Sequence, residues 1–361
     1  MSVSTPLSEI SIEITKRCLQ DCEHCSSRAS NFATEFLPKE EIMRIATDFK
    51  TLGGKKIELS GGEPLLHNDI SCLINALKQL DLRVHLFTSG TISENNQDAS
   101  IDAMVQLLKQ SGVDKVIFSL HGANKRTHDE IVRLPGSFSR AVQFITKLVK
   151  ENIIVGIHFV PMASNFVEFV DLVKFAASLK VTDISVLRFV PQGRGEDNRS
   201  SLMLNKVEVA EFVELLTREE RRTDISVKVG SHLDFTFLLD NSPPKPCTAG
   251  KTKCLVEVNG DVIPCAVFKG MTVKGANNFV AGNLKTDTLS NVWNNSKIFK
   301  IFRDFDPNLL VGACKGCNHL FTCKGRCPAQ RIYDHEDFYT GPDDYCPKEI
   351  YDKRVSKETS L

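Results

Sequence analysis

The 361-residue chain lacks an excess of charge of either sign, because 45 Lys and Arg residues balance 45 Asp and Glu residues. This balance removes the attraction that drives non-specific binding to phosphate, so we expect no nucleic-acid partner. The chain also lacks a long hydrophobic run: the longest, 153–163, is much shorter than the roughly 20 residues that cross a bilayer. The N-terminus carries neither the charged nor the apolar region of a secretory signal. We therefore expect a cytoplasmic protein with no membrane partner.

Cysteine, in contrast, is abundant and unevenly placed. Of the 12 cysteines, three lie from Cys18 to Cys25 and eight lie from Cys247 to Cys346. In a reducing compartment, cysteines clustered at short spacings indicate metal ligation rather than a disulfide framework. The remaining one, Cys72, falls in an amphipathic helical pattern, where we expect a small buried hydrophobic residue.

Short β-branched runs alternate with helical patterns through the first half of the chain. The segments between these runs carry apolar residues at i, i+3 and i+4 spacing, which suits helices that cover a parallel sheet. The predicted strands lie near residues 9–15, 55–59, 84–88, 115–119, 153–160 and 183–188. This alternation predicts an α/β fold with a partial (β/α)6 barrel of the TIM type. A helix over 205–221 and a strand over 225–229 are expected to follow.

The composition changes in the last third of the chain. Three prolines in 241–247 predict a linker, so we expect a barrel domain over 1–235 and a small cysteine-rich domain over 236–361. The second part shows one hairpin pattern, turning at Asn259 and Gly260, and one helical pattern near 288–303. So little apolar core per residue indicates that bound metal stabilises this part.

The first cysteine cluster, Cys18-x3-Cys22-x2-Cys25, directly follows the first predicted strand, at the end where β/α barrels hold their active sites. Three thiolates can hold a four-iron cluster and leave one iron open for a small molecule, whereas structural zinc needs four ligands. His24 is a possible fourth zinc ligand, but it adjoins Cys25, and neighbouring residues rarely reach one tetrahedral ion. Spacing alone leaves iron-sulfur and zinc as alternatives.

This pattern resembles the signature of the radical S-adenosylmethionine superfamily, in which an aromatic-like residue precedes the third cysteine, as His24 does here. After the second predicted strand, Gly61, Gly62, Glu63 and Pro64 resemble the family's GGEP segment, which meets the methionyl amine. Taken alone, that segment is only a turn. The resemblance further implies contacts to S-adenosylmethionine from Ser89, in a segment where the family commonly has asparagine, and from Ser119 and Arg133.

The resemblance implies a specific chemistry. Reduction of the cluster sends an electron into the bound sulfonium, which breaks down to methionine and a 5′-deoxyadenosyl radical that abstracts a hydrogen from the substrate. The cofactor performs this step, and the protein positions the reactants and excludes water. A barrel interior suits that task.

The second cysteine cluster resembles the SPASM domain motif. It implies two auxiliary [4Fe-4S] clusters, and hence three in all, with these ligand sets: Cys247, Cys254, Cys265 and Cys327; and Cys314, Cys317, Cys323 and Cys346. Because a fully ligated cluster has no open iron, electron transfer is its expected role. Eight cysteines also satisfy two tetrahedral zinc sites, and the non-enzyme alternative is therefore a zinc-stabilised binding protein.

The substrate is the least determined part. The family includes enzymes that modify ribosomally made peptides, sulfatase-maturating enzymes, and enzymes acting on haem precursors or sugars. Ala266 stands where sulfatase-maturating enzymes have aspartate, which disfavours formylglycine formation. We predict an oxidoreductase that oxidises or crosslinks a side chain of a peptide or protein. The alternative is oxidation or rearrangement of a small molecule, a tetrapyrrole side chain or a sugar.

Two side chains on the predicted strands are candidates for the substrate site: His158 and Arg188, both of which could face the barrel interior. The first strand begins near residue 8, which leaves no room for a leader-binding winged helix before it, so we expect a separate leader-recognition protein or none. The expected reductant is of the flavodoxin or ferredoxin type.

Overall fold

The computed structural model describes residues 6–93, 98–222, 224–230, 233–235, 238, 244–271 and 279–350. None of the helices among these residues has the length and apolar character needed to cross a membrane.

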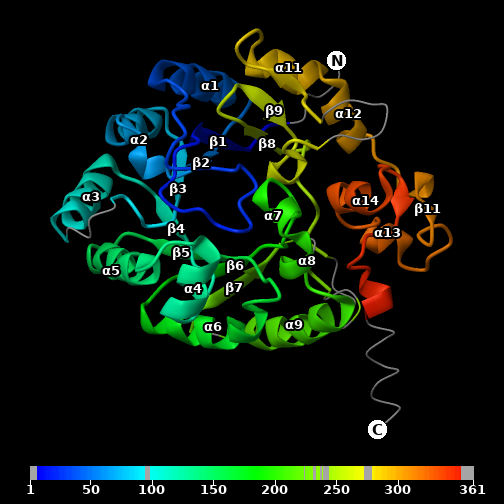
Figure 1. Cartoon of the computed structure of the whole chain (residues 1–361). Helices are drawn as coiled ribbons and strands as arrows, with labels where there is room; N and C mark the ends of the chain where they lie inside the picture. The colour runs from blue at the N-terminus through cyan, green and yellow to red at the C-terminus, as the bar shows by residue number, and fades with distance from the viewer. Residues whose placement is uncertain are drawn as a thin grey trace.

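Seven parallel strands, each paired with the next in chain order, form the wall of a partial barrel (Figure 1). They are β1 (Glu9–Thr15), β2 (Lys56–Gly61), β3 (Arg83–Thr88), β4 (Lys115–Ser119), β5 (Val155–Phe159), β6 (Asp183–Val186) and β7 (Ser226–Val229). The first six lie within a few residues of the predicted strands. The predicted α/β class and partial barrel are confirmed, and β7 extends the wall by one parallel strand.

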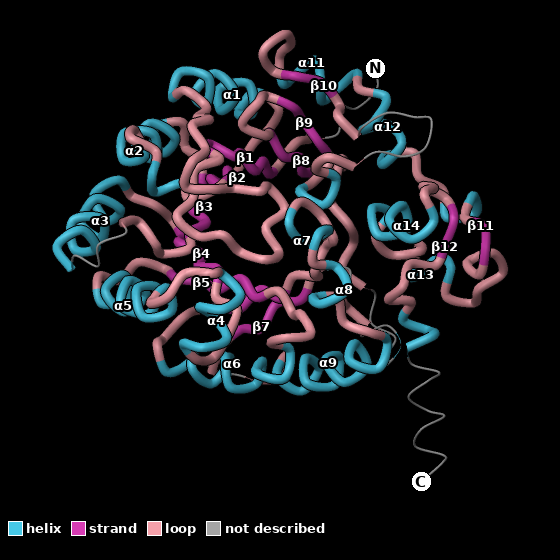
Figure 2. The backbone as a smooth tube through the Cα atoms, in the orientation of Figure 1, coloured by secondary structure: helices cyan, strands magenta, loops and turns pink. Residues whose placement is uncertain are grey.

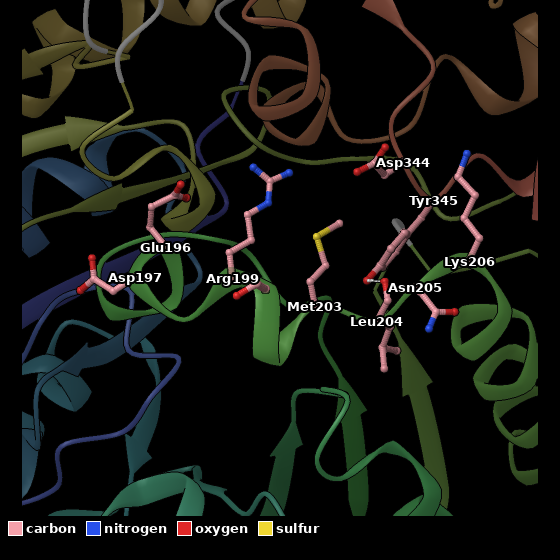
Figure 3. A pocket seen from close by; sticks show the side chains of 10 residues that line it. Glu196, Asp197, Arg199, Met203, Leu204, Asn205, Lys206, Asp344 and Tyr345 are labelled. Atoms are coloured by element: carbon pink, nitrogen blue, oxygen red, sulfur yellow. Dashed lines mark hydrogen bonds between the residues drawn. The ribbon is translucent and has the colours of Figure 1, made fainter.

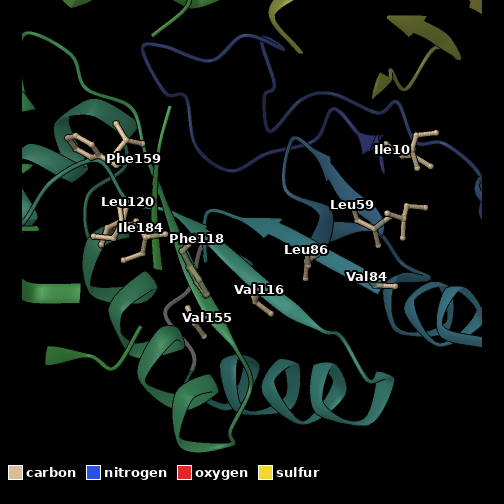
Figure 4. Close-up of a cluster of buried hydrophobic side chains, with 14 of the residues drawn as sticks. Ile10, Leu59, Val84, Leu86, Val116, Phe118, Leu120, Val155, Phe159 and Ile184 are labelled. Carbon is tan, nitrogen blue, oxygen red and sulfur yellow. The ribbon is translucent and has the colours of Figure 1, made fainter. Parts of the chain in front are cut away.

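Helices cover the outside of this wall (Figure 2). They are α1 (Lys39–Thr51), α2 (Ile70–Gln79), α3 (Asp98–Ser111), α5 (Ser137–Lys150), α6 (Phe169–Ser178) and α9 (Lys206–Glu219). Helix α4 (Lys125–Val132) lies instead beside the cysteine loop, where Val132 O accepts a hydrogen bond from Asp21 N. Because successive strand residues point to opposite faces, Ile10 and Ile12 of β1 face the covering helices and are fully buried. The matching residues of the next strands, Leu59, Val84 and Val116, lie in the same core (Figure 4).

The inward face of the barrel is polar at the end where the strands begin. Glu58 of β2 is buried there, with Lys56 Nζ 3.1 Å from its Oε1 and Lys253 Nζ 2.7 Å from its Oε2. Burial raises the pKa of Glu58, but the two lysines outweigh burial and bring that pKa down to about 2. A network of paired charges therefore fills the barrel at this end.

The cysteine-rich part continues the same sheet. Strand β8 (Lys253–Val256) runs parallel to β1 on the side opposite β2, and β9 (Asp261–Ile263) and β10 (Gly282–Asn283) follow as antiparallel neighbours. Asn259 and Gly260 lie between β8 and β9, so the predicted hairpin is confirmed. The sheet thus crosses the expected division at residues 235 and 236.

The rest of this part consists of short elements. Helices α11 (Leu289–Asn295) and α12 (Lys297–Arg303) replace the single predicted helix over 288–303, because the side chain of Ser296 accepts a hydrogen bond from the backbone of Ile298 and starts a new helix. Beyond them lie α13 (Leu320–Cys323), α14 (Pro328–His335) and a small pair of strands, β11 (Val311–Gly312) and β12 (Thr340–Gly341).

The prediction for Cys72 was wrong. It lies on α2 but is exposed, with its Sγ 2.9 Å from Lys39 Nζ. The buried face of α2 is formed instead by Ile70, Leu73, Ile74 and Leu77.

Candidate active site

The first three cysteines lie in the segment that joins β1 to α1, at the carboxyl ends of the parallel strands. The backbone N–H of Cys18 donates to Ser30 O at 3.0 Å, and that of Cys25 donates to Cys22 O at 3.2 Å, which fixes the loop. Burial raises the pKa of Cys22 well above its usual value, and the neighbouring thiols of Cys25 and Cys18 raise it further. Thiols this close together and this buried need a strong positive partner to ionise, as a metal cluster would provide.

An arginine whose side chain is 13% exposed braces this loop, and its Nη1 lies 3.1 Å from Asp21 Oδ1. Arg194 starts the short helix α7 (Arg194–Asp197), and its Nε donates to Cys22 O at 2.8 Å while its Nη1 donates to Ala29 O at 3.0 Å. Its backbone N–H also donates to Cys25 O at 3.0 Å. The buried Nη2 has no hydrogen-bond partner within the described residues. An unused cationic donor beside three thiols fits an anionic iron-sulfur cluster.

Arg194 is not among the residues that the sequence predicts for the site. The only signal is its position, in a Gly-rich polar segment that follows the sixth strand and so reaches the same end of the barrel. Polar residues after strands are common, and this signal is weak by itself.

The glycine pair after β2 brings two backbone segments into close contact. A Cβ on Gly62 would lie 2.2 Å from Arg17 O, and a Cβ on Gly61 would lie 2.2 Å from Thr15 O. The N–H of Gly62 donates to Thr15 O at 2.7 Å. Because they have no Cβ, the two glycines allow the end of β2 to pack directly against the start of the cysteine loop.

Glu63 ties the next two motifs together. Its buried carboxylate accepts hydrogen bonds from Thr88 Oγ1 at 2.8 Å, from Ser89 N at 2.7 Å and from Ser89 Oγ at 2.6 Å. Pro64 begins the short 3-10 helix (Pro64–Leu66), with Glu63 as its N-cap. Burial raises the pKa of Glu63 even though these donors oppose the rise. Glu63 after β2 and Ser89 after β3, both predicted site residues, are thus hydrogen-bonded to each other.

Three histidine rings, His24, His121 and His128, pack in a row that begins in the cysteine loop. The His24 ring meets the His121 ring edge to face at 4.3 Å between centroids, and His121 stacks on His128 at 6.2 Å. Burial lowers the pKa of His24 to about 4, so its imidazole is neutral at pH 7. The Nδ1 atoms of His24 and His121 are buried and lack a hydrogen-bond partner among the described residues. These two atoms could bind a polar ligand at this end of the barrel. His121 was not predicted.

Ser119 and His158 are partners in the ladder between β4 and β5, and so they lie side by side. His158 packs on the Phe87 ring at 4.8 Å, and burial lowers its pKa to about 4. Arg133 lies at the end of α4, half exposed, with its guanidinium 3.6 Å from Asp21 and 3.4 Å from Glu23. The structure thus places Arg133 next to the cysteine loop and His158 deeper in the barrel.

Arg188 does not face the barrel interior but contacts the C-terminal segment around residues 343–345. Its Nη1 lies 2.9 Å from Asp343 Oδ2, and both side chains are buried. The guanidinium stacks over the Tyr345 ring at 4.0 Å. Arg188 therefore connects the end of β6 to the cysteine-rich part.

The second predicted auxiliary set is brought together as a group. One cavity of about 260 Å³ is lined by all four of its cysteines, Cys314, Cys317, Cys323 and Cys346. Asp343 and Arg326 also line this cavity. No group of three or more His, Cys, Asp or Glu side chains in the described ranges converges on a single metal-ion position.

The first auxiliary set is brought together only in part. Cys247, Cys265 and Cys327 surround one small hydrophobic cluster that includes Phe268. Cys254 packs instead in the main core of the barrel.

A larger cavity, about 740 Å³, opens between the barrel and the cysteine-rich part (Figure 3). Glu196 and Asp197 of α7, Lys206 of α9, and Asp344 and Tyr345 from the end of the chain line it. Because α7 also braces the cysteine loop, this opening lies on the helix that contacts the candidate active site.

Two family models match the chain: the radical SAM superfamily over residues 12–176, and SPASM, an iron-sulfur cluster-binding domain, over residues 247–318. The chain therefore contains a radical SAM domain and a SPASM domain. Its domains bind S-adenosylmethionine (AdoMet), the radical SAM [4Fe-4S] cluster and auxiliary iron-sulfur clusters, which favours iron over the zinc alternative.

Among similar proteins, the radical SAM chain is 26% identical to the AdoMet-dependent heme synthase of Methanosarcina barkeri, over 93% of this chain and 95% of that protein. It is 25% identical to the PqqA peptide cyclase of Xanthomonas axonopodis pv. citri, over 92% of this chain and 86% of that protein. The fold resembles that of Streptococcus suis SuiB bound to S-adenosylmethionine, with a TM-score of 0.73 and 20% identity over 95% of this chain and 77% of that one.

Proposed function

We propose that this radical SAM protein oxidises or crosslinks a side chain of a ribosomally made peptide or protein. The observation that carries the proposal is the cluster of three thiols, of which Cys18 is buried, beside an Arg194 Nη2 that has no hydrogen-bond partner among the described residues. The cluster lies at the barrel end where Glu63 joins the ends of β2 and β3. Similarity to a PqqA peptide cyclase over nearly the whole chain supports a peptide as the substrate. When bound, the cluster and AdoMet supply an electron and a 5′-deoxyadenosyl radical.

The chain's own residues would hold and enclose these groups. Cys18, Cys22 and Cys25 hold the cluster, and Arg194 donates to its anionic face. The proposed contacts to AdoMet are, as a set, His24, Gly61, Gly62, Glu63, Pro64, Ser89, Ser119 and Arg133. Besides its proposed contact, Glu63 fixes the end of β3, because its carboxylate accepts hydrogen bonds from Thr88 and Ser89.

His158 is the proposed substrate-facing residue. It is neutral, and it lies beside Ser119 inside the barrel, where it can accept or donate a proton. The cavity between α7 and the end of the chain is the proposed approach for a peptide, since it is lined by charges of both signs. Arg188 is omitted from the substrate site, because Asp343 and Tyr345 hold it.

The proposal includes three assignments beyond the reaction itself. The electron donor is a protein of the flavodoxin or ferredoxin type, and the peptide binds either with a separate leader-recognition protein or without one. The cytoplasm is the proposed compartment, because the eleven clustered cysteines need reducing conditions to stay free of disulfides.

The test is the transfer of substrate deuterium into 5′-deoxyadenosine. Candidate precursor peptides, deuterated at their side chains, are incubated with the anaerobically reconstituted protein, AdoMet and a reductant. We expect deuterium in 5′-deoxyadenosine with the right peptide and none with the Cys18→Ala variant. Active AdoMet cleavage with no deuterium from any peptide would contradict a peptide substrate.

The second candidate is oxidation of a small molecule such as a tetrapyrrole side chain. Similarity to an AdoMet-dependent heme synthase over 95% of that protein's length favours it. The same assay separates the two, because a deuterated tetrapyrrole would label 5′-deoxyadenosine only if the small-molecule alternative is correct.

A further inference from the structure

Cys254 lies on the outward face of strand β8. It pairs with Ile10 of β1, whose fully buried side chain faces the covering helices. Its neighbour Lys253 points into the barrel, where Lys253 Nζ lies 2.7 Å from Glu58 Oε2. Since successive strand residues point to opposite faces, Cys254 points away from the barrel interior.

The surroundings of Cys254 are those of a core residue. Its side chain is fully buried in the same hydrophobic cluster as Trp293 of α11 and Phe299 of α12. Arg303, whose guanidinium stacks over the Trp293 ring at 4.2 Å, acts electrostatically on the Cys254 thiol. Helices α11 and α12 therefore cover the thiol.

The other three cysteines of the predicted set meet elsewhere. Cys265 precedes the short 3-10 helix Ala266–Phe268, Cys327 precedes α14, and both pack with Cys247 around Phe268. Cys254 packs in a different cluster, the main core of the barrel. The three form a group from which Cys254 is excluded.

The charges around this group are positive. Lys251 and Arg331 lie within electrostatic reach of Cys247, and Lys253 within that of Cys265. In the described part of the chain, no carboxylate or imidazole is among the main charged neighbours of these two thiols. The site thus offers three soft ligands in a cationic setting, which favours an anionic, soft fourth ligand such as a thiolate.

We propose that the first auxiliary [4Fe-4S] cluster is held by Cys247, Cys265 and Cys327 alone, and that its fourth iron takes an exchangeable thiolate from outside the described chain. Cys254 is a core residue and not a ligand. This rests on the proposed function, because it requires that the sites hold iron-sulfur clusters. It changes the expected role of this cluster: an open iron can bind a substrate thiolate directly, whereas the second auxiliary site keeps four cysteines.

The first test is the iron and sulfide content of the full-length protein after anaerobic reconstitution. Wild type should hold about 12 irons per chain, Cys254→Ala and Cys254→Val should hold the same, and the matched Cys265→Ala variant should fall to about eight. The valine variant refills the core volume if alanine leaves a destabilising cavity. A loss of about four irons in both Cys254 variants would overturn the inference. Zinc without iron in wild type would overturn the proposed function instead.

The second test probes the open iron by electron paramagnetic resonance. The reduced Cys18→Ala/Cys22→Ala/Cys25→Ala protein, which keeps only the auxiliary sites, is titrated with 2-mercaptoethanol as the thiolate probe. We expect the g-values of one cluster to shift, the shift to persist when Cys323→Ala is added, and the shift to vanish when Cys265→Ala is added. An unchanged spectrum at saturating thiolate would overturn the open site, even with all auxiliary iron present.

Discussion

Replacement of Arg188 distinguishes a structural role from a substrate role. The Arg188 side chain is 3% exposed, its partner Asp343 is 0% exposed, and 2.9 Å separates the paired atoms. Arg188→Met leaves a buried carboxylate without its cation, and breaking a buried pair in this way costs about 3–5 kcal/mol. At about 3 kcal/mol per molar urea, the unfolding midpoint should fall by about 1 M or more.

The assay is anaerobic urea unfolding of the reconstituted protein, followed by circular dichroism. A double variant, Arg188→Met/Asp343→Leu, removes both charges and should recover most of the lost stability, because apolar side chains of similar volume replace the pair. If Arg188→Met unfolds within about 0.5 kcal/mol of wild type and instead raises the KM for substrate, the structural role is refuted.

Three further predictions concern the barrel. Gly62→Ala should lose the radical SAM cluster, measured as about four irons per chain, because its Cβ would lie 2.2 Å from Arg17 O; full iron retention would contradict the close contact. Arg194→Met should reconstitute with less iron and lose it faster to a chelator, since the loop loses its brace; unchanged release would show that the brace is dispensable. The lowered pKa of Glu58 stabilises the fold fully above about pH 4.5, and about 3 kcal/mol is lost as the pH falls towards 2. The free energy of unfolding of Glu58→Gln, measured between pH 7 and pH 3, should therefore fall less with acid than that of wild type. An identical pH profile for the two proteins would argue against this role of Glu58.

The barrel was predictable because its signals are local. Each β-branched run produces a strand and each amphipathic segment a helix, so the ends of the first six strands, and with them the cysteine loop and Glu63, could be placed from the sequence. The packing of β8 against β1 was not predictable, because it joins segments more than 200 residues apart and no local pattern specifies that register.

The same limit bears on two cysteines. The SPASM resemblance groups Cys254 with the other ligands, whereas we propose that it is not a ligand, because a shift of one residue along β8 decides which face its side chain takes. Cys72 lies on α2 between Ile70 and Leu73 of the buried face but on the exposed side of the helix, so its burial was misjudged. Arg194 and His121 were missed because each follows a strand in a polar segment, a pattern too common to mark a site.

Reductive cleavage of AdoMet tests the central claim most directly. Wild type, Cys22→Ala and Cys323→Ala proteins are reconstituted, reduced with dithionite and assayed for 5′-deoxyadenosine. Wild type should release it, Cys22→Ala should release none, and Cys323→Ala should keep some uncoupled cleavage while losing product. Iron-loaded wild type that forms no 5′-deoxyadenosine, or equal formation by wild type and Cys22→Ala, would contradict the account.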